Sequence, residues 1–198
     1  MIKAIDTRYK GYLFRSRLEA RWAVFFDQMG WSWDYEPEGF ELGGTQYLPD
    51  FKVAIPRGDH TWFEVKPRET EIDPKFDAFF KLLTKETIWG NAAQLLRGDP
   101  VDHLERIARS NQLMCLGCGT VIKGGYSACG GGEVCCYCDF CDFTGHTGDK
   151  YQGLCAPYTY HKGSLCFCTL DIDAAHRRLR AAAVAARSAR FEFGGVSA

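Results

Sequence analysis

All ten cysteines of this 198-residue chain lie between Cys115 and Cys168, and residues 1–114 contain none. Small secreted proteins spread cysteines along the chain as a disulfide framework, whereas cysteine pairs confined to one segment of a cytosolic protein indicate metal binding. The distribution therefore predicts three parts. Residues 1–112 form a core domain, residues 113–169 form a cysteine-rich insert that folds around metal, and residues 170–198 form a C-terminal helix that packs on the core.

The composition permits an ordinary apolar core and excludes several classes of protein. Hydrophobic residues make up 46% of the chain and aromatic residues 14%, which is enough to fill the interior of a moderate domain. No apolar run is long enough to cross a bilayer, and the charged N-terminus lacks a signal-peptide apolar region. We therefore expect a cytoplasmic protein with no membrane partner. Because the net charge is only −1, any nucleic-acid-binding surface must be local.

The hydrophobic pattern of the first part predicts an α/β sandwich. Ser16 is typical of an N-cap, and apolar residues follow at helical spacing until Gly30, so a helix is expected over 16–29. Strand-like runs follow at 31–42, with a break near Pro37, at 46–55 and at 61–66, which favours an antiparallel meander. Asp73-Pro74 opens a second helix, residues 92–96 form a fourth strand, and 173–193 form the last helix. The order helix, three strands, helix, strand is that of an α/β sandwich.

Two carboxylates and a lysine are expected to converge on neighbouring strands. Alternation places Glu64 and Lys66 on one face of their strand, and a short turn returns Glu64 beside Asp50. Adjacent carboxylates repel unless a cation lies between them, and Mg²⁺ prefers such hard oxygen ligands, here with help from the Val65 carbonyl. A bound metal lowers the pKa of a water and stabilises charge on a phosphate, while Lys66 orients or deprotonates that water. The set fits phosphodiester hydrolysis.

The same residues resemble the PD-(D/E)XK nuclease superfamily. The resemblance rests on the segment from Tyr9 to Ala23, on Tyr35-Glu36-Pro37, on Pro49-Asp50 and on Glu64-Val65-Lys66, and covers roughly residues 8–97. More narrowly, the chain resembles a group of phage and actinobacterial proteins and, in motif order, the endonuclease subunit of certain heteromeric transposases. The resemblance implies a restriction-endonuclease-like αβββαβ core in a bacterial or phage-infected cell. It also implies that Glu19 completes a metal site with Asp50 and Glu64, that Lys66 assists the water, and that the substrate is DNA.

Each member of this set also has a structural interpretation. Glu19 lies three residues after Ser16, which is the spacing of a capping box. Asp50 follows a proline and fits a turn, and a Glu-X-Lys strand commonly carries a solvated ion pair. Glu36 and Glu38 are assigned to a turn. The catalytic interpretation of Glu19, Asp50, Glu64 and Lys66 depends on their occurrence together in this order.

The cysteine pairs predict structural zinc. Cys115-X-X-Cys118 and Cys138-X-X-Cys141 are 19 residues apart, which is the spacing of a zinc ribbon with paired knuckles. The remaining cysteines suffice for a second site, so two structural Zn²⁺ ions are expected. Pairing stays open: Cys115 and Cys118 can instead join Cys166 and Cys168, while Cys138 and Cys141 join Cys135 or Cys136 and Cys155. Such an insert would serve recognition of nucleic acid or a protein partner.

Basic residues before the first helix are the expected contacts to nucleic acid. Arg8, Lys10, Arg15 and Arg17 precede Glu19 closely, so we expect them to bind the backbone near the scissile phosphate. The arginines of residues 173–193 fit a solvated helix face and phosphate contact equally well. The sequence thus favours a Mg²⁺- or Mn²⁺-dependent deoxyribonuclease acting on duplex, branched or single-stranded DNA. The alternatives are a non-catalytic binding module on a nuclease scaffold, and a nuclease subunit that acts only within a complex.

Overall fold

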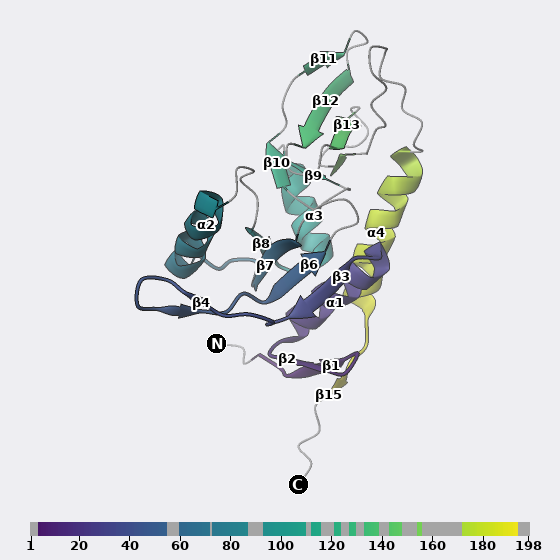
Figure 1. Cartoon of the computed structure of the whole chain (residues 1–198). Helices are drawn as coiled ribbons and strands as arrows, with labels where there is room; N and C mark the ends of the chain where they lie inside the picture. Colours follow the sequence, from purple (N-terminus) through teal and green to yellow (C-terminus); the bar gives the residue numbers. More distant parts are fainter. Residues whose placement is uncertain are drawn as a thin grey trace.

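The computed structural model shows a mixed α/β protein with a curved sheet between helices (Figure 1). It describes residues 4–54, 60–71, 73–86, 93–109, 112–115, 121–123, 127–129, 133–138, 143–147, 154–155 and 172–193. Among these, 84–86, 107–155, 172–176 and 192–193 are described as backbone only. None of the helices in these ranges is long and apolar enough to span a membrane.

Helix α1, Arg17–Met29, confirms the prediction from its end signals. The Ser16 side chain accepts a hydrogen bond from the Glu19 backbone N–H at 3.2 Å, which satisfies one free donor of the first turn. Gly30 ends the helix in the left-handed region at φ 72°, where a side chain would be strained. The apolar face of α1 is buried, with Trp22, Phe25 and Phe26 at most 1% exposed. Capping and amphipathicity therefore fix this helix locally and orient it on the sheet.

The central sheet has four strands in the order β3-β6-β7-β8. Strands β3 (Ser32–Tyr35), β6 (Phe51–Ala54) and β7 (His60–Lys66) form the predicted antiparallel meander, and β8 (Ala93–Arg97) pairs with β7 in parallel. A parallel neighbour requires a crossover connection, which helix α2 (Pro74–Glu86) supplies. The predicted order of helix, three strands, helix and strand is thus confirmed.

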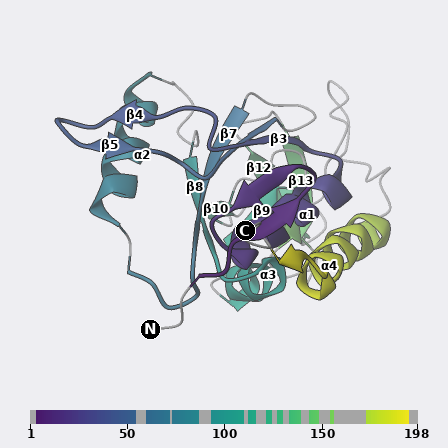
Figure 2. The ribbon, with the colours of Figure 1, turned by 90° about the horizontal axis from the view of Figure 1, so that it is seen from below.

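Side-chain alternation divides the sheet into two packed faces. Phe51, Phe63 and Val65 face α1 and the C-terminal helix α4 (Ile172–Ser188), whereas Trp62 packs with Phe79 of α2 on the opposite face. The view from below shows α2 and the hairpin of β4 (Phe40–Glu41) and β5 (Gln46–Tyr47) on one side of the sheet, with α1 and α4 on the other (Figure 2). The two faces of β7 therefore separate as its period-two pattern predicts.

The predicted strand at 46–55 is wrong in one respect, because the chain breaks it at Leu48-Pro49-Asp50. Strand β5 pairs with β4 away from the central sheet, and only β6 joins that sheet. Proline has no N–H to donate to a ladder, so the break falls at the residue least suited to continue it. Asp50 consequently lies just before β6 rather than within a strand.

A third helix and the strands formed by the two ends of the described chain were not predicted. Helix α3, Pro100–Arg109, follows Asp99, which accepts hydrogen bonds from the backbone N–H groups of Val101 and Asp102. This is the same Asp-Pro start signal as in α2. The basic leader forms a hairpin of β1 (Thr7–Tyr9) and β2 (Tyr12–Phe14), and the chain returns as β15 (Glu192–Phe193) beside β1. The last helix therefore ends at Ser188, not at residue 193, because the final residues pair with the N-terminal hairpin.

Asp99 connects α3 to α4 and should be a stability determinant. Its buried carboxylate caps α3 and forms hydrogen bonds with Arg187 of α4 at 2.6 and 2.7 Å. We expect Asp99→Ala to reduce the free energy of unfolding by about 2–3 kcal/mol, since it removes the cap and leaves Arg187 without this partner. Asp99→Asn keeps the cap and should cost less. Chemical denaturation of both variants measures the difference, and equal destabilisation would contradict the assigned role of the cap.

The cysteine-rich region contains short strands in two small sheets. One sheet has the order β10 (Val121–Lys123), β9 (Gln112–Cys115), β14 (Leu154–Cys155), and the other has the order β11 (Ser127–Cys129), β12 (Glu133–Cys138), β13 (Phe143–Thr147). Register places Cys115 beside Cys155 along the backbone, and Cys135 opposite His146. Cys118, Cys141, Cys166 and Cys168 lie outside the described residues. The zinc ligands therefore stay a prediction.

Candidate functional site

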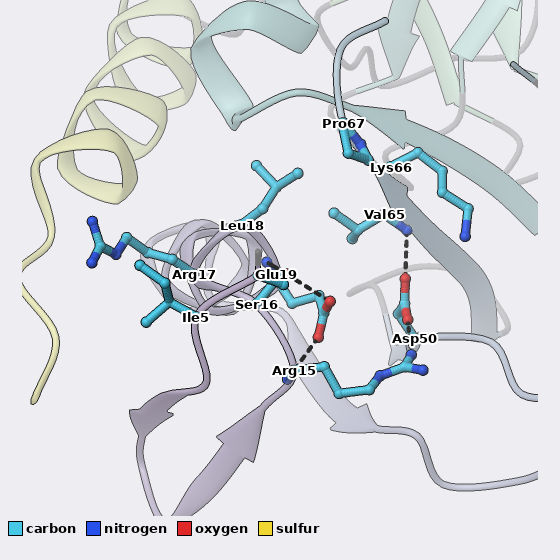
Figure 3. A pocket seen from close by; sticks show the side chains of 11 residues that line it. Ile5, Arg15, Ser16, Arg17, Leu18, Glu19, Asp50, Val65, Lys66 and Pro67 are labelled. Carbon is cyan, nitrogen blue, oxygen red and sulfur yellow. Dashed lines mark hydrogen bonds and ion pairs between the residues drawn. The ribbon is translucent and has the colours of Figure 1, made fainter. Parts of the chain in front are cut away.

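Three of the four predicted catalytic residues, Glu19, Asp50 and Lys66, line a cavity where the start of α1, the end of β7 and the segment before β6 come together (Figure 3). The cavity has a volume of about 570 Å³. Its wall includes Glu19, Asp50, Val65 and Lys66, with Arg15, Ser16, Arg17, Leu18, Pro67, Ala4 and Ile5 completing it. Residues from positions 4 to 67 thus converge because the hairpin β1–β2 and helix α1 pack against the sheet.

Asp50 is the buried centre of the site. Its side chain is only about 4% exposed, and its Oδ2 accepts a hydrogen bond from the Val65 backbone N–H at 2.7 Å. The Oδ1 atom lies 2.7 Å from the Arg15 guanidinium. The interruption of strand structure before β6 allows this arrangement. Asp50 is not part of a strand there, so its side chain can turn toward β7. The alternation of side chains in the sequence predicted that Asp50 lies near β7, but it did not predict the hydrogen bonds of Asp50 with Val65 and Arg15.

Glu64 and Lys66 form the predicted pair on one face of β7. Lys66 Nζ lies 2.6 Å from Glu64 Oε1, and the Tyr47 hydroxyl donates to Glu64 Oε2 at 2.8 Å. Glu64 is 5% exposed and Lys66 remains partly accessible at 25% of its side chain. Lys66 contributes to the wall of the cavity, whereas Glu64 lies behind it toward Tyr47. The solvated-pair interpretation is therefore wrong for the glutamate.

Glu19 is both a helix-start residue and a site residue. Its backbone N–H is capped by Ser16, while its Oε1 accepts from the Ser16 hydroxyl at 2.7 Å. The Oε2 atom accepts from the Tyr35 hydroxyl at 2.5 Å and from the Arg15 backbone N–H at 3.1 Å. Figure 3 shows the carboxylate directed into the space between α1 and Asp50. The capping and site interpretations of Glu19 are thus compatible.

Arg15 is the residue that links the carboxylates, and sequence reasoning assigned it only to nucleic acid. Its backbone contacts Glu19, and its guanidinium lies 2.7 Å from Asp50 and 2.6 Å from Glu36. Glu36 has a left-handed backbone, at φ 47°, and its N–H bonds to the Asp50 carbonyl at 2.9 Å. The turn assignment of Glu36 is correct, but this turn belongs to the site. The only sequence signal that Glu36 belongs to the site is its place in the Tyr35-Glu36-Pro37 segment of the family resemblance.

The pKa values of Asp50 and Lys66 are both raised in the site. Burial first, and then the charges of Glu64 and Glu19, raise the pKa of the Asp50 carboxyl to about 8, against the lowering effects of the Val65 N–H and Arg15. Burial alone would lower the pKa of Lys66, but its hydrogen bond to Glu64 and the charges of Glu64 and Asp50 raise it above its ordinary value. Lys66 is therefore an ammonium at neutral pH and acts as a donor.

The carboxylate oxygens of the site are of the kind that a hard divalent cation binds. Their present arrangement does not form a metal site. Glu19, Asp50 and Glu64 supply carboxylate oxygens, and the pKa of Asp50 is raised by burial and then by the charges of Glu64 and Glu19, an effect that a bound cation would oppose. Among the described residues, however, no three histidine, cysteine or acidic side chains lie close enough to form a metal cluster. The Asp50 Oδ1 atom instead faces Arg15. A metal that used this oxygen would require Arg15 to move away.

The other predicted nucleic-acid contacts occupy different positions. Lys10 lies at the tip of the β1–β2 hairpin and pairs with Asp27 at 2.8 Å, and Arg8 is exposed on β1. Arg17 lines the same cavity as Asp50, but its guanidinium points away from Asp50 (Figure 3). Arg15 is the member of this group that pairs with Asp50 and Glu36. Their contacts to DNA stay a prediction.

Comparisons of the chain with protein-family models, curated proteins and solved structures gave no match.

Proposed function

We propose that this protein is a divalent-metal-dependent deoxyribonuclease of the PD-(D/E)XK type, with a restriction-endonuclease-like core. The observation that carries the proposal is the buried Asp50 in one cavity with Glu19 and Lys66, together with the 2.6 Å contact between Lys66 and the buried Glu64. The confirmed element order supports it, since the acidic residues come from α1, the segment before β6, and β7. Mg²⁺ or Mn²⁺ is the cofactor class that suits this oxygen-rich set.

The chain's own residues would have distinct tasks in phosphodiester hydrolysis. Asp50 and Glu19, with Glu64 and the Val65 carbonyl, would hold the metal, which supplies an activated water and stabilises charge on the phosphate. Tyr35 fixes Glu19 and Tyr47 fixes Glu64 by hydrogen bonds, so both carboxylates are held in defined orientations. Because the pKa of Lys66 is raised, its ammonium would orient the attacking water or stabilise the phosphate rather than remove a proton.

Arg15 is expected to exchange between the carboxylates and the substrate. Its guanidinium lies 2.7 Å from Asp50, and its position in the cavity wall, with 59% of the side chain exposed, leaves it able to turn toward a phosphate. This reconciles its ion pairs with the predicted contact to DNA. Glu36 would then hold Arg15 near the site after Asp50 is released.

Arg15→Gln should tighten metal binding and weaken DNA binding. Loss of a competing cation is expected to increase Mn²⁺ affinity about fivefold, which corresponds to roughly 1 kcal/mol. Isothermal titration calorimetry measures the metal affinity, and fluorescence anisotropy measures DNA binding without added metal. Arg17→Gln is the matched control, since Arg17 lines the same cavity but points away from Asp50. Unchanged or weaker Mn²⁺ binding by Arg15→Gln would contradict the exchange.

The nuclease proposal is tested on several DNA forms. Purified protein is incubated with supercoiled, linear, single-stranded and branched DNA in the presence of Mg²⁺ or Mn²⁺. Metal-dependent cleavage of at least one form is expected. Binding without cleavage of any form would favour the alternative of a non-catalytic module, or of a subunit that requires a protein partner.

The cysteine-rich region is proposed to be a structural zinc module that contacts DNA or a partner protein. The cysteine spacing supports this, together with the short strands that bring Cys115 and Cys155 side by side along the backbone. Two Zn²⁺ ions per chain are expected from eight ligands, namely Cys115, Cys118, Cys135, Cys138, Cys141, Cys155, Cys166 and Cys168. A cytoplasmic setting in a bacterial or phage-infected cell fits reduced cysteines of this kind.

A further inference from the structure

A second cavity lies at the edge of the molecule where the two ends of the described chain meet. It has a volume of about 390 Å³ and is lined by Arg8, Tyr9, Lys10, Gly11, Arg190 and Phe191. Pairing of β1 with β15 creates it, with Thr7 opposite Phe193 and Arg8 opposite Glu192. Figure 1 shows these strands together below α1. The fold therefore joins basic residues that are about 180 positions apart in sequence.

The base of this cavity is rigid. Lys10 and Gly11 both have positive φ, at 48° and 83°, which is the requirement of a tight type I′ hairpin turn. The ring of Tyr9 packs edge-on against Phe191 at 6.0 Å between centroids, and its hydroxyl donates to Asp27 at 2.7 Å. The backbone that carries Arg8 and Arg190 is thus fixed by hairpin geometry and aromatic packing. A preformed site loses little entropy when it binds a ligand.

The three basic residues that line the cavity, Arg8, Lys10 and Arg190, differ in their ion pairs. Lys10 is neutralised by Asp27 at 2.8 Å. Arg8 and Arg190 are exposed, and neither forms an ion pair with any side chain that the structure describes, a set that leaves out the Glu192 side chain opposite Arg8. Two guanidinium groups that line one cavity favour an anion with several oxygen acceptors. A phosphate group has this chemistry, and arginine matches it geometrically.

The hairpin connects this cavity to the proposed active site. Ala4 and Ile5, just before β1, and Arg15, just after β2, line the catalytic cavity, whereas the hairpin tip lines the second cavity. The five residues from Lys10 to Arg15 span at most about 17 Å at roughly 3.3 Å per residue. Phosphates repeat at about 3.4 Å of axis along one strand of duplex DNA, so the separation corresponds to roughly five steps.

We propose that the cavity between β1 and β15 binds a backbone phosphate of duplex DNA within about five steps of the cleaved bond, through Arg8 and Arg190. The proposal rests on the nuclease function and adds a contact from the C-terminal end of the chain. Such a contact positions the duplex without reading sequence. It also explains why the C-terminal residues return to pair with the N-terminal hairpin, since only that pairing brings Arg190 to Arg8.

The test is the salt dependence of DNA binding by Arg8→Gln, Arg190→Gln and the double variant. Each single substitution should weaken binding of a fluorescent duplex about five- to tenfold at roughly 0.1 M salt and reduce the log–log salt slope by about 0.9. Binding is measured by anisotropy without added Mg²⁺ or Mn²⁺. Arg180→Gln, at an exposed position of α4 outside the cavity lining, is the matched control and should leave both quantities unchanged.

The outcomes separate this proposal from the nuclease function. Wild-type affinity and slope in both single variants would overturn the phosphate site, even where the wild-type protein cleaves DNA. A loss of affinity without a change of slope would also overturn it, because a phosphate contact releases counterions. Conversely, the expected slope changes in a protein that cleaves no DNA would support the site and remove the nuclease proposal alone. Circular dichroism melting checks that each variant is folded.

Discussion

Lys66→Ala is expected to reduce the rate of DNA cleavage by about 100- to 1,000-fold, which is the usual effect of removing one donor that stabilises developing charge. The ammonium of Lys66 lies at the wall of the cavity that contains Asp50 and is held 2.6 Å from Glu64. Its raised pKa keeps it charged at neutral pH. The effect should appear mainly in the turnover rate, because the predicted interaction strengthens as charge develops on the phosphate. Single-turnover cleavage of labelled DNA measures it.

Two variants delimit the role of Lys66. Lys66→Arg retains the positive charge and should recover part of the lost rate, although the planar guanidinium changes the donor geometry. Lys52→Ala is the matched control, since Lys52 belongs to β6 of the same sheet and contacts Trp62 outside the cavity. Wild-type cleavage by Lys66→Ala, or an equal loss in Lys52→Ala, would contradict the assigned role.

Asp50→Asn should abolish both cleavage and stabilisation by metal. The wild-type protein is expected to gain about 5–10 °C in Tm when Mn²⁺ is present at about 100-fold above its Kd. The variant lacks the central carboxylate, so this gain should disappear. Differential scanning fluorimetry with and without Mn²⁺ measures it. Asp34→Asn is the control, because Asp34 is exposed on β3 of the same sheet and should keep the full gain.

The same substitution should change the pH dependence of stability. The pKa of Asp50 is about 8 in the folded protein, above the ordinary value of 3.8. Between these values the folded protein retains a proton that the unfolded chain releases, so the metal-free protein should lose stability as pH rises through this window. We expect a decrease in Tm on the order of 5 °C between pH 6 and pH 8.5, and a smaller one in Asp50→Asn. An increase in wild-type Tm over this range would contradict the assigned repulsion.

Local signals explain how much of the fold could be predicted from the sequence. The start and end of α1 follow from Ser16 and Gly30, and the faces of β7 follow from strict alternation. These features depend on neighbours in the chain. The interruption before Asp50 was missed because a run of apolar residues reads as one strand even where proline prevents a continuous ladder. The helix after Asp99 was missed although its start signal matched that of α2.

Long-range contacts account for what could not be predicted in the site. Arg15 was recognised as basic, but its pairing with Asp50 depends on how hairpin β1–β2 packs against the sheet. Tyr35 and Tyr47 lie on different strands, and no local pattern shows that they fix Glu19 and Glu64. Arg190 reaches Arg8 only through the pairing of β15 with β1. The residue types indicated the chemistry of the site, whereas the contacts between these residues depend on tertiary packing.

The most direct measurement of the central claim is conversion of supercoiled plasmid by the purified full-length protein, with and without Mn²⁺, beside Asp50→Asn and Lys66→Ala. The proposed function predicts nicked or linear product that requires the metal, is absent for Asp50→Asn and is strongly reduced for Lys66→Ala. Product that persists equally in both variants would show that another protein or another site cleaves the DNA, and would contradict the assignment of this cavity as the nuclease centre.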